Sequence, residues 1–176
     1  MRKGLIISGL LLSMFCCGLT VYAEEQEPNM PKLQTISSIG SLLNTGFYED
    51  ALAKCDEAMK KYPKEPELYY WSGMIKSKLG DNKSAIKEYD TAISLNPKNS
   101  SAYVMRGIAK SDIEDFDGAI ADFNHAISIN PKDSSAYSMR ACVKIQTGDI
   151  DGALKDMQTA NKLMDEEEAA KASAKK

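Results

Sequence analysis

Apolar residues recur along most of this 176-residue chain with the spacing of amphipathic helices. Around residue 123, one helical face is formed by residues that recur three and four positions apart: Ala119, Ile120, Phe123, Ala126 and Ile127. A second apolar group precedes it, and acidic residues separate the two. The pattern therefore predicts two helices joined by a short turn.

This arrangement returns every 34 residues. The periodic positions are alanines and prolines: Ala51, Ala85, Ala119 and Ala153; Ala58, Ala92, Ala126 and Ala160; and Pro63, Pro97 and Pro131. A fixed period of this length is typical of a solenoid built from small helical repeats. We divide the chain into four helix–turn–helix units of 34 residues, which together cover about 136 of the 176 residues: 32–65, 66–99, 100–133 and 134–167.

Aspartates and prolines mark the ends of the second helix in these units. Asp81, Asp115 and Asp149 stand where a side-chain oxygen can cap the second helix. Proline ends the helix because it lacks a backbone donor and restricts the residue before it. The periodic alanines lie on the second helix, where a small side chain lets the two helices approach closely.

The periodic positions resemble those of the tetratricopeptide repeat. In that family, position 4 is aromatic, position 8 small, position 20 Ala, position 24 aromatic, position 27 Ala and position 32 Pro. The two central units match at all six positions, with Tyr69, Gly73, Ala85, Tyr89, Ala92 and Pro97 in one and Tyr103, Gly107, Ala119, Phe123, Ala126 and Pro131 in the other.

The outer units diverge from this pattern. The first has Thr35, Ile39 and Cys55 at positions 4, 8 and 24, and the fourth has Met157 at position 24 and Asp165 in place of the proline. The acidic run 165–168 is predicted to be a solvated end of the last helix that stops further stacking, followed by a polar tail at residues 168–176.

The resemblance implies an all-α fold, a right-handed superhelical solenoid of about four helix–turn–helix units. In the family, positions 2, 5, 9 and 12 of the first helices line a concave groove that binds peptides or helices. The matching residues, which we predict to form a peptide-binding groove, include Tyr70, Met74, Ser77, Val104, Ile108, Ser111, Ser138 and Cys142. The alternative is that several of them only pack between units.

The predicted groove is apolar with small hydroxyl groups. Chaperone-binding members of the family carry a carboxylate clamp of Lys, Asn and Arg, whereas the matching positions here include Tyr70, Met74, Met105 and Ser101. The resemblance therefore favours another protein as the partner, bound as a hydrophobic peptide or a helix and not through a free C-terminal carboxylate.

A ladder of charges departs from the family pattern. Position 11 is Lys in the last three units, position 7 is Arg in the last two, and position 23 on the facing helix is acidic: Lys76, Lys110 and Lys144; Arg106 and Arg140; and Glu88, Asp122 and Asp156. The first unit has Ser38, Leu42 and Lys54 instead. Because the charges come and go together, we predict a structural ion-pair ladder and not a ligand site.

The first 31 residues differ from the repeats. Two basic residues, an uncharged stretch at residues 4–23 and two glutamates follow one another, which is the layout of a secretory signal. We expect residues 1–23 to be a cleaved signal peptide and residues 24–31 to be a linker. Two alternatives stay open: residues 4–23 remain as a membrane anchor, or Cys16 or Cys17 is lipidated.

Composition argues against several other functions. The chain has 22 Lys and Arg against 25 Asp and Glu, a net charge of −3, and thus no basic surplus for nucleic acid. We expect His125, the single histidine, to be partly exposed, and Cys142 to be a small buried apolar residue. The sequence has no Cys-x-x-Cys pair, Gly-x-Ser-x-Gly elbow or phosphate-binding glycine loop. We therefore expect no catalytic, cofactor-binding or metal-binding residues.

These features together predict an exported, non-enzymatic scaffold for protein–protein interaction, located in the periplasm of a bacterial envelope or secreted. The alternative is a membrane-tethered accessory factor of an envelope assembly or secretion machine, with residues 4–23 as an uncleaved anchor. Membrane association is expected only if the N-terminal segment is retained or lipidated.

Overall fold

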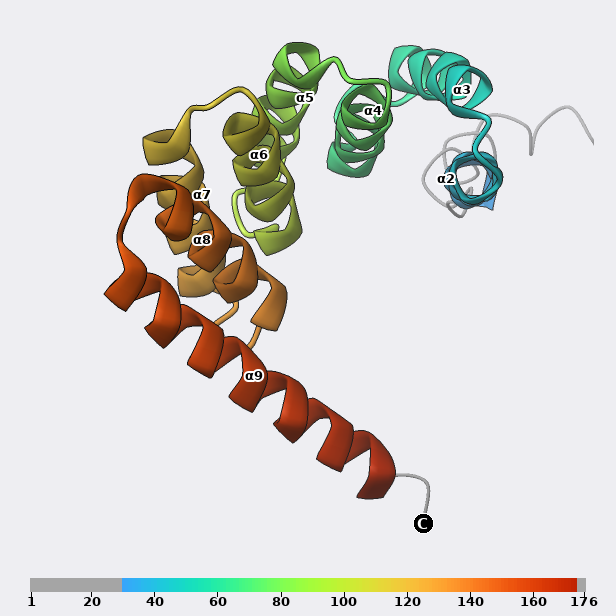
Figure 1. Cartoon of the computed structure of the whole chain (residues 1–176). Helices are drawn as coiled ribbons and strands as arrows, with labels where there is room; N and C mark the ends of the chain where they lie inside the picture. The colour runs from blue at the N-terminus through green and yellow to red at the C-terminus, as the bar shows by residue number, and fades with distance from the viewer. Residues whose placement is uncertain (1–29, 174–176) are drawn as a thin grey trace, which may run out of the picture.

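The computed structural model describes residues 30–173, which form helices and the turns between them (Figure 1). Eight helices occupy this part of the chain: α2 (Met30–Thr45), α3 (Tyr48–Lys61), α4 (Pro66–Lys78), α5 (Asn82–Leu95), α6 (Ser100–Asp112), α7 (Phe116–Ile129), α8 (Ser134–Thr147) and α9 (Ile150–Ser173). The predicted all-α fold is confirmed.

The helices pack as sequential pairs, α2/α3, α4/α5, α6/α7 and α8/α9, and each pair packs against the next. Figure 1 shows the pairs following one another in a curved row, from which the C-terminal part of α9 extends. Successive first helices also contact one another along the row. A single helix pair cannot bury its apolar face alone, so the stacked neighbours supply a shared core.

The predicted aspartate caps are present. Asp81, Asp115 and Asp149 each accept a hydrogen bond through Oδ1 from the backbone N–H three residues ahead, at 3.1, 3.0 and 2.9 Å. Each bond satisfies a backbone donor that the first turn of a helix leaves unpaired. The caps therefore set the starts of α5, α7 and α9.

A left-handed residue makes the turn between the two helices of each pair. Gly46, Gly80 and Gly148 have φ values of 81°, 84° and 85°. In the third unit this residue is Glu114, which has a φ of 65°. Glycine adopts this region without steric cost, whereas a residue with a Cβ is strained there.

Positions 8 and 24 of the central units pack closely against each other in the core. A Cβ on Gly73 would lie 2.6 Å from the ring of Tyr89, and one on Gly107 would lie 2.8 Å from the ring of Phe123. Both rings are 1% exposed. The absence of a side chain at position 8 thus lets a buried aromatic ring lie against the backbone of the first helix.

The first and last described helices are longer than the repeat units predict. The predicted signal peptide, residues 1–23, lies outside the described residues. Helix α2 begins at Met30, inside the predicted linker at residues 24–31, and α9 continues to Ser173, through most of the predicted tail. From residue 164 onward its side chains are exposed, as predicted for a solvated end. Among the described helices, none combines the length and apolar character needed to cross a bilayer.

Candidate functional site

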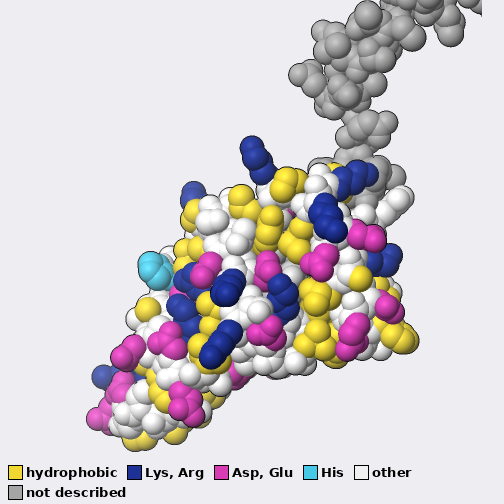
Figure 2. Space-filling view, turned by 90° about the horizontal axis from the view of Figure 1, so that it is seen from above, with side chains coloured by type: hydrophobic (Ala, Val, Ile, Leu, Met, Phe, Trp, Pro, Cys, Tyr) yellow, Lys and Arg dark blue, Asp and Glu magenta, His cyan; other side chains and the backbone are white. Residues whose placement is uncertain are grey.

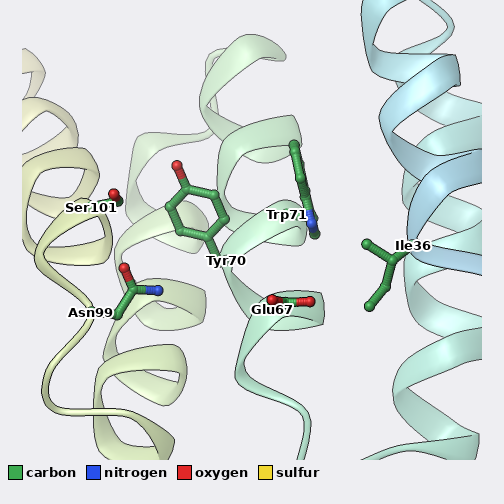
Figure 3. Close-up of a pocket in the computed structure, with 6 residues that line it drawn as sticks. All are labelled: Ile36, Glu67, Tyr70, Trp71, Asn99 and Ser101. Atoms are coloured by element: carbon green, nitrogen blue, oxygen red, sulfur yellow. The ribbon is translucent and has the colours of Figure 1, made fainter. Parts of the chain in front are cut away.

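A pocket of about 270 Å³ opens among the first helices of three successive units. Its lining residues are Ile36 of α2, Glu67, Tyr70 and Trp71 of α4, Asn99 just before α6, and Ser101 of α6. In Figure 3 the Tyr70 ring lies between Trp71 and the two α6-side residues, and Ile36 faces Trp71 across the gap between α2 and α4. The pocket therefore exists only when the three units are stacked.

An aromatic wall forms the centre of this pocket. The rings of Tyr70 and Trp71 meet edge to face with centroids 5.7 Å apart, and Tyr70 lies 6.2 Å from the buried ring of Tyr89. Trp71 also packs against the core of the first unit, which includes Ile39 and Cys55. Burial raises the pKa of the Tyr70 phenol above its usual value, so its hydroxyl stays protonated near neutral pH and can donate a hydrogen bond.

The charge at the pocket comes from one carboxylate. Glu67 is the charged residue in its lining, and no ion pair joins Glu67 to another described residue. Asn99 accepts a hydrogen bond from the Ala102 N–H at 3.2 Å, which holds its amide at the start of α6. The pocket thus combines apolar walls with a few polar groups and one unpaired negative charge, an arrangement suited to an apolar side chain accompanied by a positive charge.

The predicted groove residues lie on α4, α6 and α8, and Tyr70 lines the pocket. Met74 packs against the core around Tyr89, and Ile108 packs against the core around Phe123. Five of the predicted groove residues are partly buried: Met74, Ser77, Ile108, Ser111 and Ser138. Their burial fits the alternative in which part of the predicted groove packs between units.

The exposure of Val104 and that of Cys142 differ from the sequence prediction. Val104 is 3% exposed and belongs to the core cluster of Phe123 and Val143, so it has no surface to offer a ligand. The prediction that Cys142 is buried is wrong, because it is exposed on α8. The reason is its place in the row: no described helix stacks on the far side of α8 and α9. His125 is exposed, as predicted, and its ring stacks on Tyr103 at 5.4 Å.

Five of the six pocket residues, all except Tyr70, are not among the predicted groove residues: Ile36, Glu67, Trp71, Asn99 and Ser101. Ser101 was considered only as a clamp position, and Glu67 occupies the same position 2 of its unit, which the family pattern directs into the groove. Ile36 occupies position 5 of the divergent first unit. Trp71 is the single tryptophan of the chain and follows Tyr70 directly, which was a usable signal for an aromatic site.

The predicted ion-pair ladder is present between the paired helices. Asp122 of α7 receives Arg106 Nε at 2.9 Å, Arg106 Nη2 at 2.5 Å and Lys110 Nζ at 2.9 Å. One unit later, Asp156 of α9 receives Arg140 Nε at 2.8 Å, Arg140 Nη2 at 2.6 Å and Lys144 Nζ at 2.9 Å. Lys76 and Glu88 form the corresponding pair between α4 and α5.

The charged residues of the ladder pair with one another inside the fold. The two carboxylates of Asp122 and Asp156 are nearly buried, with side chains 3% and 7% exposed, and each is satisfied by two cations. Arg106 and Arg140 also lie over the rings of Tyr103 and Tyr137. Elsewhere on the surface, Figure 2 shows basic and acidic side chains interspersed on one face, with the single histidine projecting at its edge. The ladder is therefore structural, as predicted.

Comparison with known proteins identifies the class of repeat. Residues 66–99 and 100–133 each match the tetratricopeptide repeat family model. These are the two units that carry all six family positions. Two units of this helical repeat fold are thus tetratricopeptide repeats, and stacked helical repeats of this kind form extended concave surfaces.

Solved structures share this fold at low sequence identity. A crystal structure of MamA has a TM-score of 0.71 at 23% identity, covering 86% of each chain, and MamA from Desulfovibrio magneticus RS-1 has a TM-score of 0.70 at 19% identity, covering 82% of this chain and 81% of that one. The first repeat domain of Spaghetti (RPAP3), bound to the HSP90 peptide SRMEEVD, has a TM-score of 0.64 at 19% identity, covering 66% and 92%.

One protein that is similar in sequence is much longer than this chain. The probable biofilm formation methyltransferase WspC of Pseudomonas putida is 31% identical over 53 residues. These residues are 30% of this chain and 12% of that protein, so the chain spans only a small part of its length.

Proposed function

We propose that this protein is a non-catalytic scaffold that binds a segment of another protein along α2, α4, α6 and α8. The observation that carries this proposal is the pocket walled by Tyr70 and Trp71, which three stacked units build together. Rigid aromatic side chains supply large contact areas at a low entropic cost and are enriched in protein-binding sites. The surrounding partly buried Met74 and Ile108 extend this surface with adaptable apolar groups.

The bound segment carries an apolar side chain next to a Lys or Arg. The apolar side chain enters between Ile36 and the Trp71 ring, and the positive charge lies near Glu67, which has no ion-pair partner among the described residues. The structural relative RPAP3 is bound to a peptide with two glutamates and a C-terminal aspartate. A peptide of that charge would meet repulsion from Glu67, so the two proteins differ in the ligands that they accept.

Trp71 supplies a direct assay, because it is the only tryptophan in the chain and lies in the pocket. We expect ten-residue peptides with one Leu or Phe flanked by lysines to shift the Trp71 fluorescence and to bind more tightly at low salt. Peptides with flanking aspartates should bind at least about tenfold more weakly.

Charge reversal tests the proposal without disturbing the fold. Glu67→Lys should invert the preference between the two peptide sets, because Glu67 is exposed and unpaired with any described residue. The matched control is Glu57→Lys, an exposed position on α3, which should leave the preference unchanged. Peptide binding that is indifferent to Glu67→Lys and leaves Trp71 fluorescence unchanged would contradict the proposed site.

We also propose that the scaffold is exported and acts in the bacterial envelope or outside the cell. The support is the secretory layout of residues 1–23, which lie outside the described residues. Amino-terminal sequencing of the protein from its host decides between the forms. A chain that begins at Glu24 supports export with cleavage, an intact N-terminus in the membrane fraction supports the tethered accessory factor, and a chain that begins at a lipid-modified cysteine supports the lipoprotein.

A further inference from the structure

The C-terminal end of the row carries an exposed apolar face on α9. Ile150, Leu154 and Met157 lie on one side of this helix and are 60%, 55% and 46% exposed. Their spacing of four and three residues places them in a continuous stripe. We refer to these three residues as the end face.

The same positions are partly or fully buried in every earlier unit. On α7 they are Phe116, Ile120 and Phe123, which pack in one cluster with residues of α8. On α5, Ile86 and Tyr89 pack with Met105 and Ala109 of α6. The end face is therefore a copy of an interface that the chain already forms internally, in which a second helix is covered by the first helix of the next unit.

No described residue covers the end face. By the 34-residue period, the covering helix would begin at residue 168, but residues 168–173 continue α9 and are exposed. Contiguous apolar patches on a protein surface often mark interaction sites. The opposite end of the row is different: Gln34 and Ser41 of α2 are exposed and polar.

This difference argues against α2 of a second copy as the covering helix. Gln34 and Ser41 occupy positions 3 and 10, which are apolar and buried in each helix that covers another unit: Leu68 and Ile75, Ala102 and Ala109, and Ala136 and Val143. In a second copy, α4, α6 and α8 are already buried in their own row. The described part of a second copy thus has no free helix with the covering pattern.

The covering helices α6 and α8 share a pattern that specifies the missing one. Both read Ala-x-x-Met-Arg-x-x, followed by Ala109 in α6 and Val143 in α8. The arginine of this pattern reaches back to the preceding unit: Arg106 Nη1 lies 2.7 Å from Asp90 Oδ1, and Arg140 Nη1 lies 2.5 Å from Asn124 Oδ1. The equivalent residue on α9 is Gln158, which is exposed and has an amide oxygen that can accept the same bond.

We propose that the end face binds an amphipathic helix of a partner protein, which takes the place of a fifth first helix. This helix carries small apolar residues at its positions 3 and 10, Met or a similar side chain at 6, and Arg at 7. It packs on Leu154 and Met157, and its arginine donates to Gln158. This second binding surface is independent of the pocket at Tyr70 and Trp71.

The chain provides its own probe for this site. A fluorescently labelled, side-chain-stapled peptide with the α8 sequence, residues 134–147, serves as the covering helix, because an unconstrained helix of this length is marginal in water. Fluorescence anisotropy with the full chain is expected to show saturable binding. Leu154→Asp should weaken it at least about tenfold, while Leu79→Asp, an exposed leucine outside the end face, should leave it unchanged.

Two further measurements keep the test specific. Gln158→Lys should weaken peptide binding because the introduced lysine repels the arginine of the peptide. A peptide that carries Arg140→Ala should bind the wild type and the Gln158→Lys variant equally well. Trp71 fluorescence should stay constant when the peptide binds, because the end face is separate from the pocket at Tyr70 and Trp71. Each of the two proposals can therefore be contradicted independently of the other. Absence of peptide binding would overturn the inference, as would a dimer abolished by Leu154→Asp, which would show a second copy on the end face, or protection of α9 by residues 1–29.

Discussion

Arg106 of α6 and Asp122 of α7 form a two-point ion pair, with Nε 2.9 Å from Oδ2 and Nη2 2.5 Å from Oδ1. The Asp122 side chain is 3% exposed, so the pair joins the two helices of a unit inside the core. Fork-to-fork pairing of this kind is strong and orients both side chains. Because Arg106 also reaches Asp90 of α5, one side chain links three helices in two units.

Asp122→Asn should destabilise the protein markedly. The amide keeps the shape but removes the charge that compensates Arg106 and Lys110, so we expect a loss of about 2–4 kcal/mol in the free energy of unfolding, measured with urea. Glu88→Gln is the control, because this residue pairs with Lys76 alone and is more exposed; its loss should be about 1 kcal/mol or less. An unchanged melting temperature for Asp122→Asn would show that the ion-pair ladder does not contribute to the stability of the protein.

Gly107→Ala should destabilise the third unit even though alanine favours helices. The added Cβ would lie 2.8 Å from the Phe123 ring, and relieving this overlap is expected to cost about 1–3 kcal/mol. Thermal unfolding of the double variant Gly107→Ala, Phe123→Met should recover part of the loss, since the fourth unit combines Ala141 with Met157 at the same positions.

Gly40 provides the matched control for that substitution. A Cβ on Gly40 of α2 would meet no atom within 4 Å. Gly40→Ala should therefore be neutral or stabilise the protein by up to about 1 kcal/mol through helix propensity alone. Equal losses at the two glycines would show that the contact with Phe123 is not the cause.

Glu114→Gly should raise the stability of the protein. Glu114 adopts a φ of 65° at the turn where the other three units have glycine. Relief of this strain is expected to exceed the entropic cost of glycine and to add up to about 1 kcal/mol, which calorimetry would detect as a rise of a few degrees in melting temperature. Gly80→Ala, at a φ of 84°, should have the opposite sign; a loss of stability in Glu114→Gly would refute the strain argument.

Stability should fall in acid partly through Asp156. Burial opposes ionisation of this carboxyl, but Arg140 and Lys144 outweigh burial and hold its pKa below the usual value. Since the folded-state pKa lies below an unfolded-state value of about 3.9, the ion pairs contribute fully above that pH, and their contribution is lost as the pH falls through the folded-state pKa. The melting temperature of Asp156→Asn should therefore fall less steeply than that of the wild type below about pH 4. Parallel curves would exclude Asp156 from the acid response.

The ladder and the caps were predictable from the sequence because each depends on residues in fixed register within one unit. Asp122 lies 16 positions after Arg106, and the two-helix geometry of a repeat brings such residues together wherever they occur. The pocket was predicted only through Tyr70. Its other walls come from three units, and their approach depends on how the units stack, which the period does not specify.

The sequence by itself determined the helix pairs, the turns, the caps and the partners of the buried charges, because these arise from contacts that recur every 34 residues. Only the tertiary structure decided how exposed each repeated position is. Ile108 and Cys142 both occupy position 9 of their units, yet Ile108 is partly buried and Cys142 is exposed. The physical reason is that a unit in a solenoid is covered by its neighbours, so burial depends on the place of a residue in the row as well as on its position in the repeat.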